Sequence, residues 1–341
     1  MDKTQRGERM IKEIYQVFED QKHGIYQIRC KDDFFTVEFY DQEEKDIFLA
    51  SVHQLQDEKR DIDEILHELY EQHPKEKVNA VIEELRQLDL LVEDDLRDRF
   101  ADHLTEQLNF WDYSKSPKSP PAFQMQERVQ NTILAIVGNK FRIDLIAQKA
   151  KMCGFENIST VEITSSEDQI LAHIEKSDFS IVDSNEWNPG VLEQINQLAV
   201  TKNIPWLFIQ GCNALSASIG PLFTGRHNGC YHCLMTRMKS NMEFVPHFEE
   251  FEKYLRNGKR SSTSCGAPIP LYDLIASISV LETLKYVTEW SVPSLYKTFI
   301  TIDYFSLTIT HHKLLKVPTC PVCEPAQDFL QAPWLEPVTL T

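Results

Sequence analysis

The sequence lacks the features by which secreted, membrane-spanning and nucleic-acid-binding proteins are usually recognised. No apolar run reaches the roughly 18 residues that a membrane-spanning helix needs, and residues 1–6 contain no apolar core of a signal peptide. Positive charge is scarce, because 35 Lys and Arg stand against 52 Asp and Glu and leave a net charge of −17. So acidic a surface repels phosphate. We therefore expect a cytoplasmic protein whose main partner is neither nucleic acid nor a membrane.

The length and the cysteine content narrow the class further. A chain of 341 residues is longer than one small domain, since domains average roughly 150 residues, and two domains are expected. The eight cysteines would stay reduced in the cytosol. There, thiols more often bind metal or take part in catalysis than form disulfides.

Residues 1–95 carry the pattern of a small module with three strands followed by three helices. Apolar residues alternate in the third strand, as in a half-buried strand, and recur at three- and four-residue spacing in the helices. The strands are expected at 11–18, 24–30 and 34–39, and the helices at 43–56, from Asp61 and from Pro74. This order predicts a winged-helix-like module.

A linker is expected at 96–130. An acidic stretch leads there into the sequence Ser-Lys-Ser-Pro-Lys-Ser-Pro-Pro at 114–121, which has few ways to join a packed element.

From residue 131 the pattern becomes an alternation of strands and helices. Residues 132–137 form a continuous apolar run, as in a strand buried on both faces. Further strands are expected at 159–163, 179–182 and 206–209, and helices at 142–152, 167–176 and 190–201. The alternation predicts right-handed crossovers and a parallel, Rossmann-like sheet in a domain at 131–325, followed by a tail at 326–341.

Two Cys-x2-Cys pairs are the most specific local signal in the chain. Cys230 and Cys233 form the first pair, and Cys320 and Cys323 form the second. Four thiolates in tetrahedral geometry favour Zn²⁺. Because all four ligands are Cys, no coordination position is left open for catalysis, so the spacing predicts a structural zinc. A redox role for either pair alone, or four unrelated core cysteines, are the alternatives.

Read in order, the motifs after residue 131 resemble the E1-like (ThiF/MoeB-type) superfamily. A first Rossmann strand ends in Gly138, and a later one ends in Asp183. The sequence Gly-Pro-Leu-Phe-Thr-Gly at 220–225 then precedes the first cysteine pair, and a strand–turn–strand precedes the second. The resemblance covers about 131–325 and implies a homodimer.

The departures from the E1-like pattern concern the nucleotide site. Members bind ATP through a Gly-x-Gly-x-x-Gly turn, in which missing side chains let backbone N–H groups approach phosphate. Here Lys140 and Ile143 stand at the second and third glycine positions. No basic cluster follows Glu162, and Glu186 takes the place of the family's metal-binding Asp. We therefore expect a degenerate nucleotide site that binds no ATP, at Gly138, Lys140, Glu162, Asp183 and Glu186.

A non-catalytic E1-like fold with a zinc clip and a three-strand, three-helix module is similar to one group of proteins. These are the ThiF-type (Ocin-ThiF-like) partners of YcaO cyclodehydratases in the biosynthesis of ribosomally made, post-translationally modified peptides (RiPPs), such as bacteriocins with thiazole or oxazole rings. The N-terminal module resembles their PqqD-like precursor-recognition element.

The resemblance implies a peptide-binding edge. The leader of a precursor peptide would add as a strand to 34–39, beside the helix at 75–89, with backbone hydrogen bonds giving affinity and side-chain pockets giving register. For the helix residues the alternative is that they face the module's own core. The residues expected to contact the peptide are Phe34, Phe35, Thr36, Val37, Glu38, Phe39, Val78, Ile82 and Leu85.

The function implied is recruitment rather than catalysis. The protein would bind a leader peptide and would recruit it to, and activate, a separate ATP-dependent YcaO cyclodehydratase that forms azolines from Cys, Ser or Thr. The alternative is an adenylating E1-like enzyme acting on a peptide carboxylate, which would need Arg142 in its nucleotide site as well. A third possibility is a zinc-stabilised scaffold for an unrelated partner. Residues 240–260 look amphipathic and could serve as a lid, a dimer contact or a docking surface.

Overall fold

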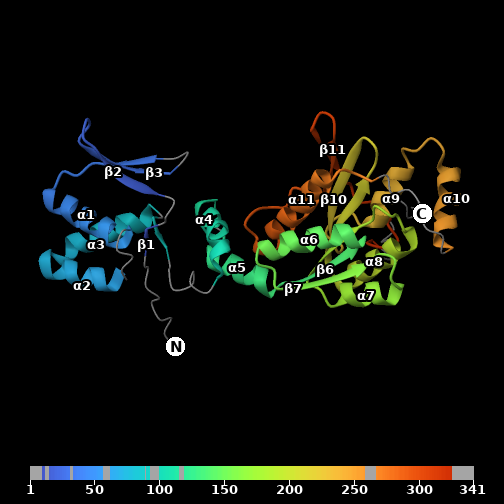
Figure 1. The fold of residues 1–341 in the computed structure, drawn as a ribbon, viewed down its shortest axis with the longest axis horizontal. Helices are drawn as coiled ribbons and strands as arrows, with labels where there is room; N and C mark the ends of the chain where they lie inside the picture. Colours follow the sequence, from blue (N-terminus) through green and yellow to red (C-terminus); the bar gives the residue numbers. More distant parts are fainter. Residues whose placement is uncertain are drawn as a thin grey trace, which may run out of the picture. The chain divides into compact units, whose positions relative to one another are not determined.

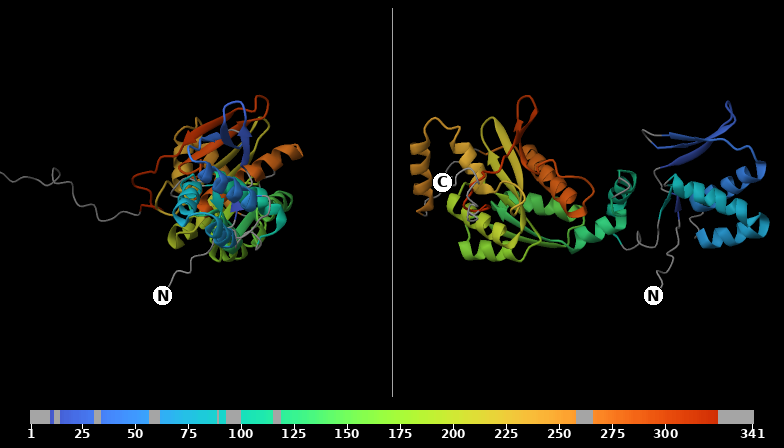
Figure 2. Two further views of the ribbon diagram at one scale, coloured as in Figure 1. Left: turned by 90° about the vertical axis from the view of Figure 1, so that its left-hand side faces the viewer. Right: turned by 180° about the vertical axis from the view of Figure 1, so that it is seen from behind.

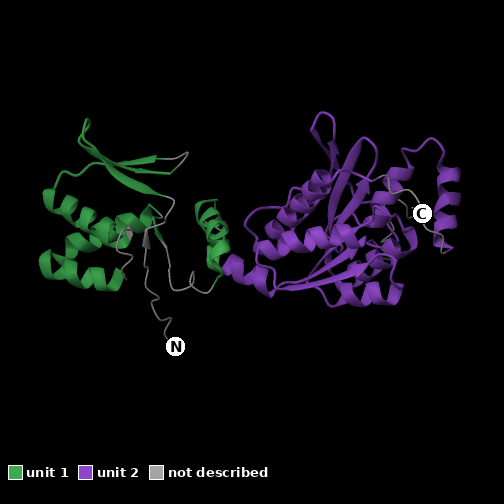
Figure 3. Ribbon diagram, viewed as in Figure 1, with its two compact units in different colours: residues 1–123 green, residues 124–341 purple. Residues whose placement is uncertain are grey.

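The computed structural model of the protein describes residues 10–11, 15–30, 34–56, 62–88, 90–92, 100–114, 119–257 and 266–324. The chain divides into two compact units, residues 1–123 and 124–341 (Figure 3). The tail expected at 326–341 lies outside the described residues.

The N-terminal unit contains a three-stranded antiparallel sheet and three helices (Figure 1). The strands lie in the order β2-β3-β4, and two short strands, β1 and β5, pair with each other elsewhere in the unit. The strands are β1 (Met10–Ile11), β2 (Gln16–Asp20), β3 (Ile25–Arg29), β4 (Phe34–Val37) and β5 (Leu91–Val92). The helices are α1 (Gln42–Gln56), α2 (Ile62–Gln72) and α3 (Lys75–Gln87).

One face of this sheet and the inner faces of the three helices share a single hydrophobic core. Tyr26, Ile28 and Val37 are buried in it from the sheet, because alternate residues of a strand point to the same face. Ile65 and Val78 are buried in the same core from α2 and α3. The predicted order of three strands and three helices is therefore present in the structure.

The segment expected to be a linker contains regular structure. Helix α4 (Thr105–Ser114) lies within 96–130, α5 (Ala122–Asn131) extends one residue beyond it, and a 3-10 turn precedes α4. Leu104, Leu108 and Trp111 are buried, so apolar residues at helical spacing form a packed face here despite the neighbouring acidic and proline-rich sequence. Residues 115–118 of the proline-rich run lie outside the described residues.

The second unit is built on a seven-stranded mixed sheet with the order β12-β11-β10-β9-β8-β6-β7. The four strands β7, β6, β8 and β9 are parallel, as the alternation of helices and strands predicts. The other three strands are antiparallel, because short turns join β9 to β10 and β11 to β12 and such hairpins allow only antiparallel pairing. The strands are β6 (Ile133–Gly138), β7 (Asn157–Glu162), β8 (Phe179–Asp183), β9 (Pro205–Cys212), β10 (Ser216–Thr224), β11 (Thr298–Asp303) and β12 (Ile309–Lys313).

Helices cover both faces of the parallel part of the sheet (Figure 2). Helix α6 packs against α11, and α8 packs against α7, α9 and α10. These helices are α6 (Lys140–Met152), α7 (Glu167–Glu175), α8 (Pro189–Lys202), α9 (Tyr231–Lys239), α10 (Val245–Arg256) and α11 (Ile269–Thr288). Among the helices of the described residues, none combines the length and the apolar character needed to cross a bilayer.

Candidate functional site

The four cysteines of the two pairs meet in one buried cluster. Cys230 and Cys233 lie at the start of α9, and Cys320 and Cys323 lie in the turns after β12. Their sulfur atoms all lie within 4.8 Å of one another. The Cys230 and Cys320 sulfurs are 3.7 Å apart, and those of Cys233 and Cys323 are 3.6 Å apart.

These distances fit a metal ion better than disulfides. Four sulfurs placed about 2.3 Å from a zinc ion at the corners of a tetrahedron are about 3.8 Å apart, whereas a disulfide bond is about 2.05 Å long. The donor set also suits zinc, because thiolates are soft ligands. The cluster is therefore compatible with a closed Zn²⁺ site that all four side chains would hold.

The chain around the cluster is shaped for close approach. At Gly229 a Cβ atom would lie only 3.2 Å from the Leu314 side chain and 3.3 Å from the Lys316 backbone, so a glycine lets the two segments meet. The Val317 N–H donates a hydrogen bond to the Cys233 sulfur over 3.3 Å. A hydrogen bond from the Cys230 thiol lowers the pKa of Cys233 to about 4, whereas burial raises the pKa of Cys323 to about 12. The surroundings thus favour the thiolate of Cys233 and oppose that of Cys323, which a bound cation would stabilise.

The crevice in which Rossmann-type folds bind ligands lies at the carboxyl ends of β6 and β8. Strand β6 has β7 on one side and β8 on the other, so the crossovers diverge there. Gly138 ends β6 and Asp183 ends β8. The residues expected to form a degenerate nucleotide site are thus partly gathered at the point where the fold predicts a ligand.

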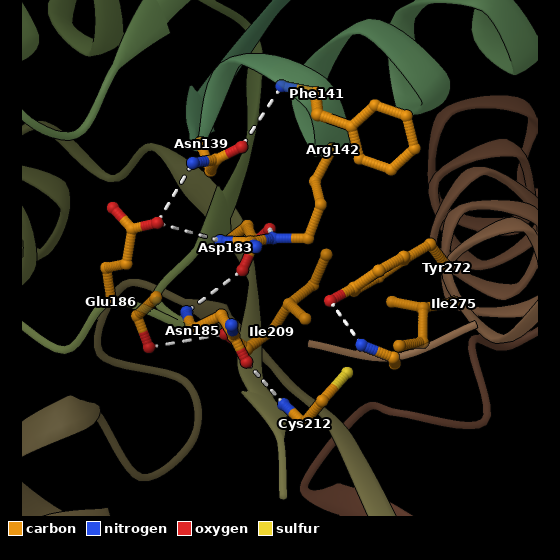
Figure 4. Close-up of polar contacts among 12 residues, drawn as sticks. Asn139, Phe141, Arg142, Asp183, Asn185, Glu186, Ile209, Cys212, Tyr272 and Ile275 are labelled. Atoms are coloured by element: carbon orange, nitrogen blue, oxygen red, sulfur yellow. Dashed lines mark hydrogen bonds and ion pairs between the residues drawn. The ribbon is translucent and has the colours of Figure 1, made fainter. Parts of the chain in front are cut away.

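A buried ion pair fills this crevice (Figure 4). Arg142 extends from the first turn of α6, and its Nε donates a hydrogen bond to the Asp183 carboxylate. The Asn185 N–H donates to the other oxygen of the same carboxylate over 3.0 Å. Tyr272 of α11 places its ring 5.8 Å from the Arg142 guanidinium. Arg142 is 8% exposed and Asp183 is 2% exposed, so the pair belongs to the interior of the unit.

The start of α6 is likewise unsuited to phosphate. The Asn139 side-chain oxygen accepts a hydrogen bond from the Phe141 N–H over 3.1 Å and so caps the helix itself. The Asn139 amide donates to the Glu186 carboxylate over 2.9 Å. A helix N-terminus attracts anions, but here a carboxylate of the chain already occupies its neighbourhood.

Two predicted residues do not join this group. Lys140 pairs with Asp144 on the exposed side of α6, and Glu162 ends β7 with an exposed side chain. At Gly138 a Cβ atom would lie 2.8 Å from the Asp183 Cβ and 3.0 Å from Ile143, so these side chains already use the room that a missing side chain leaves. The cavity lined by Arg142 and Asp183 measures about 10 Å³, which is room for about one water molecule. As packed here, these side chains leave no space for a nucleotide between them.

Arg142 is the central residue that the sequence-based prediction placed only in the alternative nucleotide site. A signal was available, because the buried residues of α6 include Arg142, Ile143, Ile146 and Ala150. An arginine on the buried stripe of a helix requires a carboxylate partner, and Asp183 ends a strand buried along its whole length.

The residues predicted to contact a peptide fall into two groups. Phe34, Phe35, Thr36 and Glu38 are exposed on or beside β4, whose outer edge pairs with no other strand described in the unit. Val37 and the partly buried Phe39 pack on the core, and so do the helix residues Val78, Ile82 and Leu85, which are at most 2% exposed. The three helix side chains are buried and expose no surface that a peptide could contact. Of the predicted residues, those exposed on or beside β4 do.

Comparisons with known proteins agree on the fold. No protein-family model and no curated protein sequence matches the chain. The solved structure of the heterocyclase TruD matches with a TM-score of 0.68 and 17% identity, over 94% of this chain and 43% of that chain. A heterocyclase in complex with substrate and cofactor matches with a TM-score of 0.66 and 16% identity, over 93% of this chain and 39% of that one. Escherichia coli MccB, solved with AMPCPP and MccA, matches with a TM-score of 0.60 and 12% identity, over 93% of this chain and 99% of that one.

At these identities the likeness shows the fold alone. It supports the predicted Rossmann-type, E1-like fold, and it covers nearly the whole of this chain. The chain spans less than half the length of the two heterocyclase chains.

Metal content tests the cysteine cluster. We expect the full chain to contain one zinc ion and Cys323→Ser to lose it, since three thiolates and a hydroxyl form a weaker site. The loss should also lower the thermal midpoint, because binding of structural zinc stabilises a fold by about 10 kcal/mol in small domains. Elemental analysis after dialysis measures the metal. Cys30→Ser, outside the cluster, is the control and should keep full zinc. Zinc-free wild-type protein with an unchanged midpoint would contradict the site.

Unfolding at two pH values tests the buried ion pair. Arg142→Met leaves the Asp183 carboxylate buried without its cation, which should cost about 3–5 kcal/mol at pH 8. Burial raises the pKa of Asp183 and Arg142 opposes that rise. In the variant, Asp183 therefore takes up a proton more readily in the folded state than in the unfolded state. The loss in the free energy of unfolding, relative to wild type, should become smaller as the pH falls to 5.

Urea unfolding followed by tryptophan fluorescence measures this difference, since four of the five tryptophans lie in 124–341. Lys140→Met removes an exposed ion pair of the same helix and should change the free energy of unfolding by less than about 1 kcal/mol. Equal losses of unfolding free energy in the two variants would show that the Arg142–Asp183 pair stabilises the fold no more than an exposed ion pair does.

Proposed function

We propose that the protein is a non-catalytic recruitment factor for a modified-peptide pathway. Its N-terminal unit, a PqqD-like element, binds the leader of a ribosomal precursor peptide along β4. The complex then delivers the peptide to, and activates, a separate ATP-dependent YcaO cyclodehydratase that forms azolines from Cys, Ser or Thr. The observation that carries this proposal is the Arg142–Asp183 pair, which fills the crevice where an adenylating enzyme of this fold would need its nucleotide.

The two edges of the N-terminal sheet differ in a way that favours β4 as the peptide site. Strand β2 carries Glu19 and Asp20, and charges on an edge strand oppose pairing with another chain. Strand β4, with the sequence Phe-Phe-Thr-Val, has no charge and no proline. Its unpaired N–H and C=O groups offer a template for an added strand. The strand carries exposed aromatic rings at Phe34 and Phe35, and Tyr40 follows it with another.

The structural neighbours support a peptide substrate and a separate partner. One heterocyclase was solved with substrate and cofactor, and MccB with MccA. More than half of each heterocyclase chain lies outside the match, and in the proposal a separate cyclodehydratase carries out the cyclisation. Holding a peptide beside that protein raises its effective concentration to about the millimolar range. A homodimer held together by the second unit completes the proposal.

Calorimetric titration with Mg-ATP tests the non-catalytic part. We expect no saturable heat up to millimolar nucleotide, because the crevice lacks the volume for ATP. E. coli MccB, which has been solved with ATP, is the positive control. Saturable binding in the micromolar range would overturn the proposal and would put the adenylating enzyme in first place.

Peptide binding tests the recruiting part. Short peptides encoded next to the gene are labelled with fluorescein and titrated with the full chain, and anisotropy reports binding. Phe35→Lys places a charge on the core-facing side of β4 and should weaken binding at least tenfold. Phe18→Lys, on β2 at the other edge, is the matched control because its ring is about equally exposed. It should change the affinity less than twofold. Equal effects of the two substitutions, or no binding by any of these peptides, would contradict the proposal.

A further inference from the structure

We propose that β4 admits its peptide in one register, set by an apolar residue beside Phe34 and a basic residue beside Glu38. This inference rests on the proposed function and names the peptide class that the site takes. The ligand is a five-residue strand with a basic residue at one end and apolar residues at the second, fourth and fifth positions.

The register begins with the two faces of β4. Val37 lies opposite Tyr26 and Phe35 opposite Ile28 on the face that packs on the core. Thr36 lies opposite Gln27 and Phe34 opposite Arg29 on the other face. An added strand must repeat this alternation, so its residues beside Phe35 and Val37 cover apolar surface. A shift of one residue would turn those side chains to solvent.

The two ends of the edge differ in the charged side chains that the described residues place there. At one end the Arg29 guanidinium lies 5.0 Å from the centre of the Phe34 ring. This cation would repel a second cation on the peptide, so the position beside Phe34 favours an apolar side chain. At the other end Glu38 follows the strand, and the alternation places it on the face of Phe34 and Thr36.

Glu38 is a carboxylate near that end with no cationic partner among the described residues. It is exposed and forms no ion pair with any residue that the structure describes. Several neighbouring acids are already engaged: Asp41 and Glu43 form ion pairs with Lys77 and Glu19 with Lys45, and Asp20 is hydrogen-bonded to His23 and Gln27. A Lys or Arg of the peptide placed across from Glu38 would therefore gain the cross-strand pair that the chain itself does not supply.

The charge of the whole unit acts in the same direction. Residues 1–123 hold 30 of the 52 acidic and 17 of the 35 basic residues, and thus −13 of the net charge of −17. Such a field attracts a basic segment and steers its approach, and salt screens it over about 8–10 Å. A peptide with carboxylates in the bound stretch would meet repulsion from the unit as well as from Glu38.

Synthetic peptides with named sequences test the register. The probe for an antiparallel strand carries Lys-Val-Thr-Ile-Val between Gly-Ser flanks, and the probe for a parallel strand carries the reverse order. Each is labelled with fluorescein and titrated with the full chain at low and physiological salt. Each probe has two comparison peptides. In the first, Lys is replaced by Glu, and in the second, the apolar residues are moved by one position.

We expect one of the two directions to bind and the Lys-to-Glu peptide to bind about three- to fivefold more weakly. The position-shifted peptide should bind at least tenfold more weakly. Glu38→Lys should reverse the preference, so that the Glu peptide binds better than the Lys peptide. Glu83→Lys, which changes an exposed acid on α3 by the same charge, should leave the Lys peptide the tighter binder. Through the field of the unit it should slightly weaken the Lys peptide and slightly strengthen the Glu peptide, and only at low salt.

The outcomes separate this inference from the proposed function. Preference for Lys that survives Glu38→Lys, or equal binding of the position-shifted peptide, overturns the register. If neither the antiparallel nor the parallel probe binds, the register is also overturned, because the proposed pattern of residues would then not be enough for binding. If encoded peptides still bind and still depend on Phe35, the proposed function stands without this register.

Discussion

Two pairs of buried cysteines bring together segments that lie ninety residues apart, and with a metal ion bound the second half of residues 124–341 would depend on this closure. Cys230 meets Cys320 and Cys233 meets Cys323 across that distance in the sequence. The chain between them supplies α9, α10, α11 and the last two strands of the sheet. With a metal ion bound to all four thiolates, these elements could not separate from the parallel core independently. A metal bound there would therefore fix the antiparallel side of the sheet as well as its own ligands, because binding to the folded state is linked to folding.

The crevice shows how a ligand site can become part of the packing. In a Rossmann-type fold the diverging crossovers leave room at the carboxyl ends of two strands. Here Arg142 enters that room from the helix and Asp183 meets it from the strand, with Asn185 and Tyr272 around them. The guanidinium and the carboxylate neutralise each other there. The fold keeps its shape, and the interior is filled by its own side chains.

Much of this architecture could be predicted from the sequence, and the failures have physical reasons. The cysteine pairs depend on local spacing, and the strands β6 and β8 on continuous apolar runs, so both were accessible. Helices α4 and α5 were missed because acidic residues and prolines outweighed a short buried face that includes Trp111. The pairing of Arg142 with Asp183 joins residues 41 positions apart, and only the topology of the sheet shows that they meet. Val78, Ile82 and Leu85 carry equal apolar character whether they face a peptide or a core, so the burial of α3 had to come from the structure.

An uncharged outer strand has a consequence for the empty protein. The backbone groups that make β4 receptive to a peptide are equally receptive to the β4 of another copy, and such edges promote association. The acidic character of the unit opposes that contact through mutual repulsion. The solubility of the unliganded chain thus depends on two opposing effects: pairing through β4 and repulsion between the acidic surfaces. Salt weakens the repulsion and not the pairing, so added salt favours self-association. A bound peptide would occupy the free edge of β4 and so prevent two copies from pairing there.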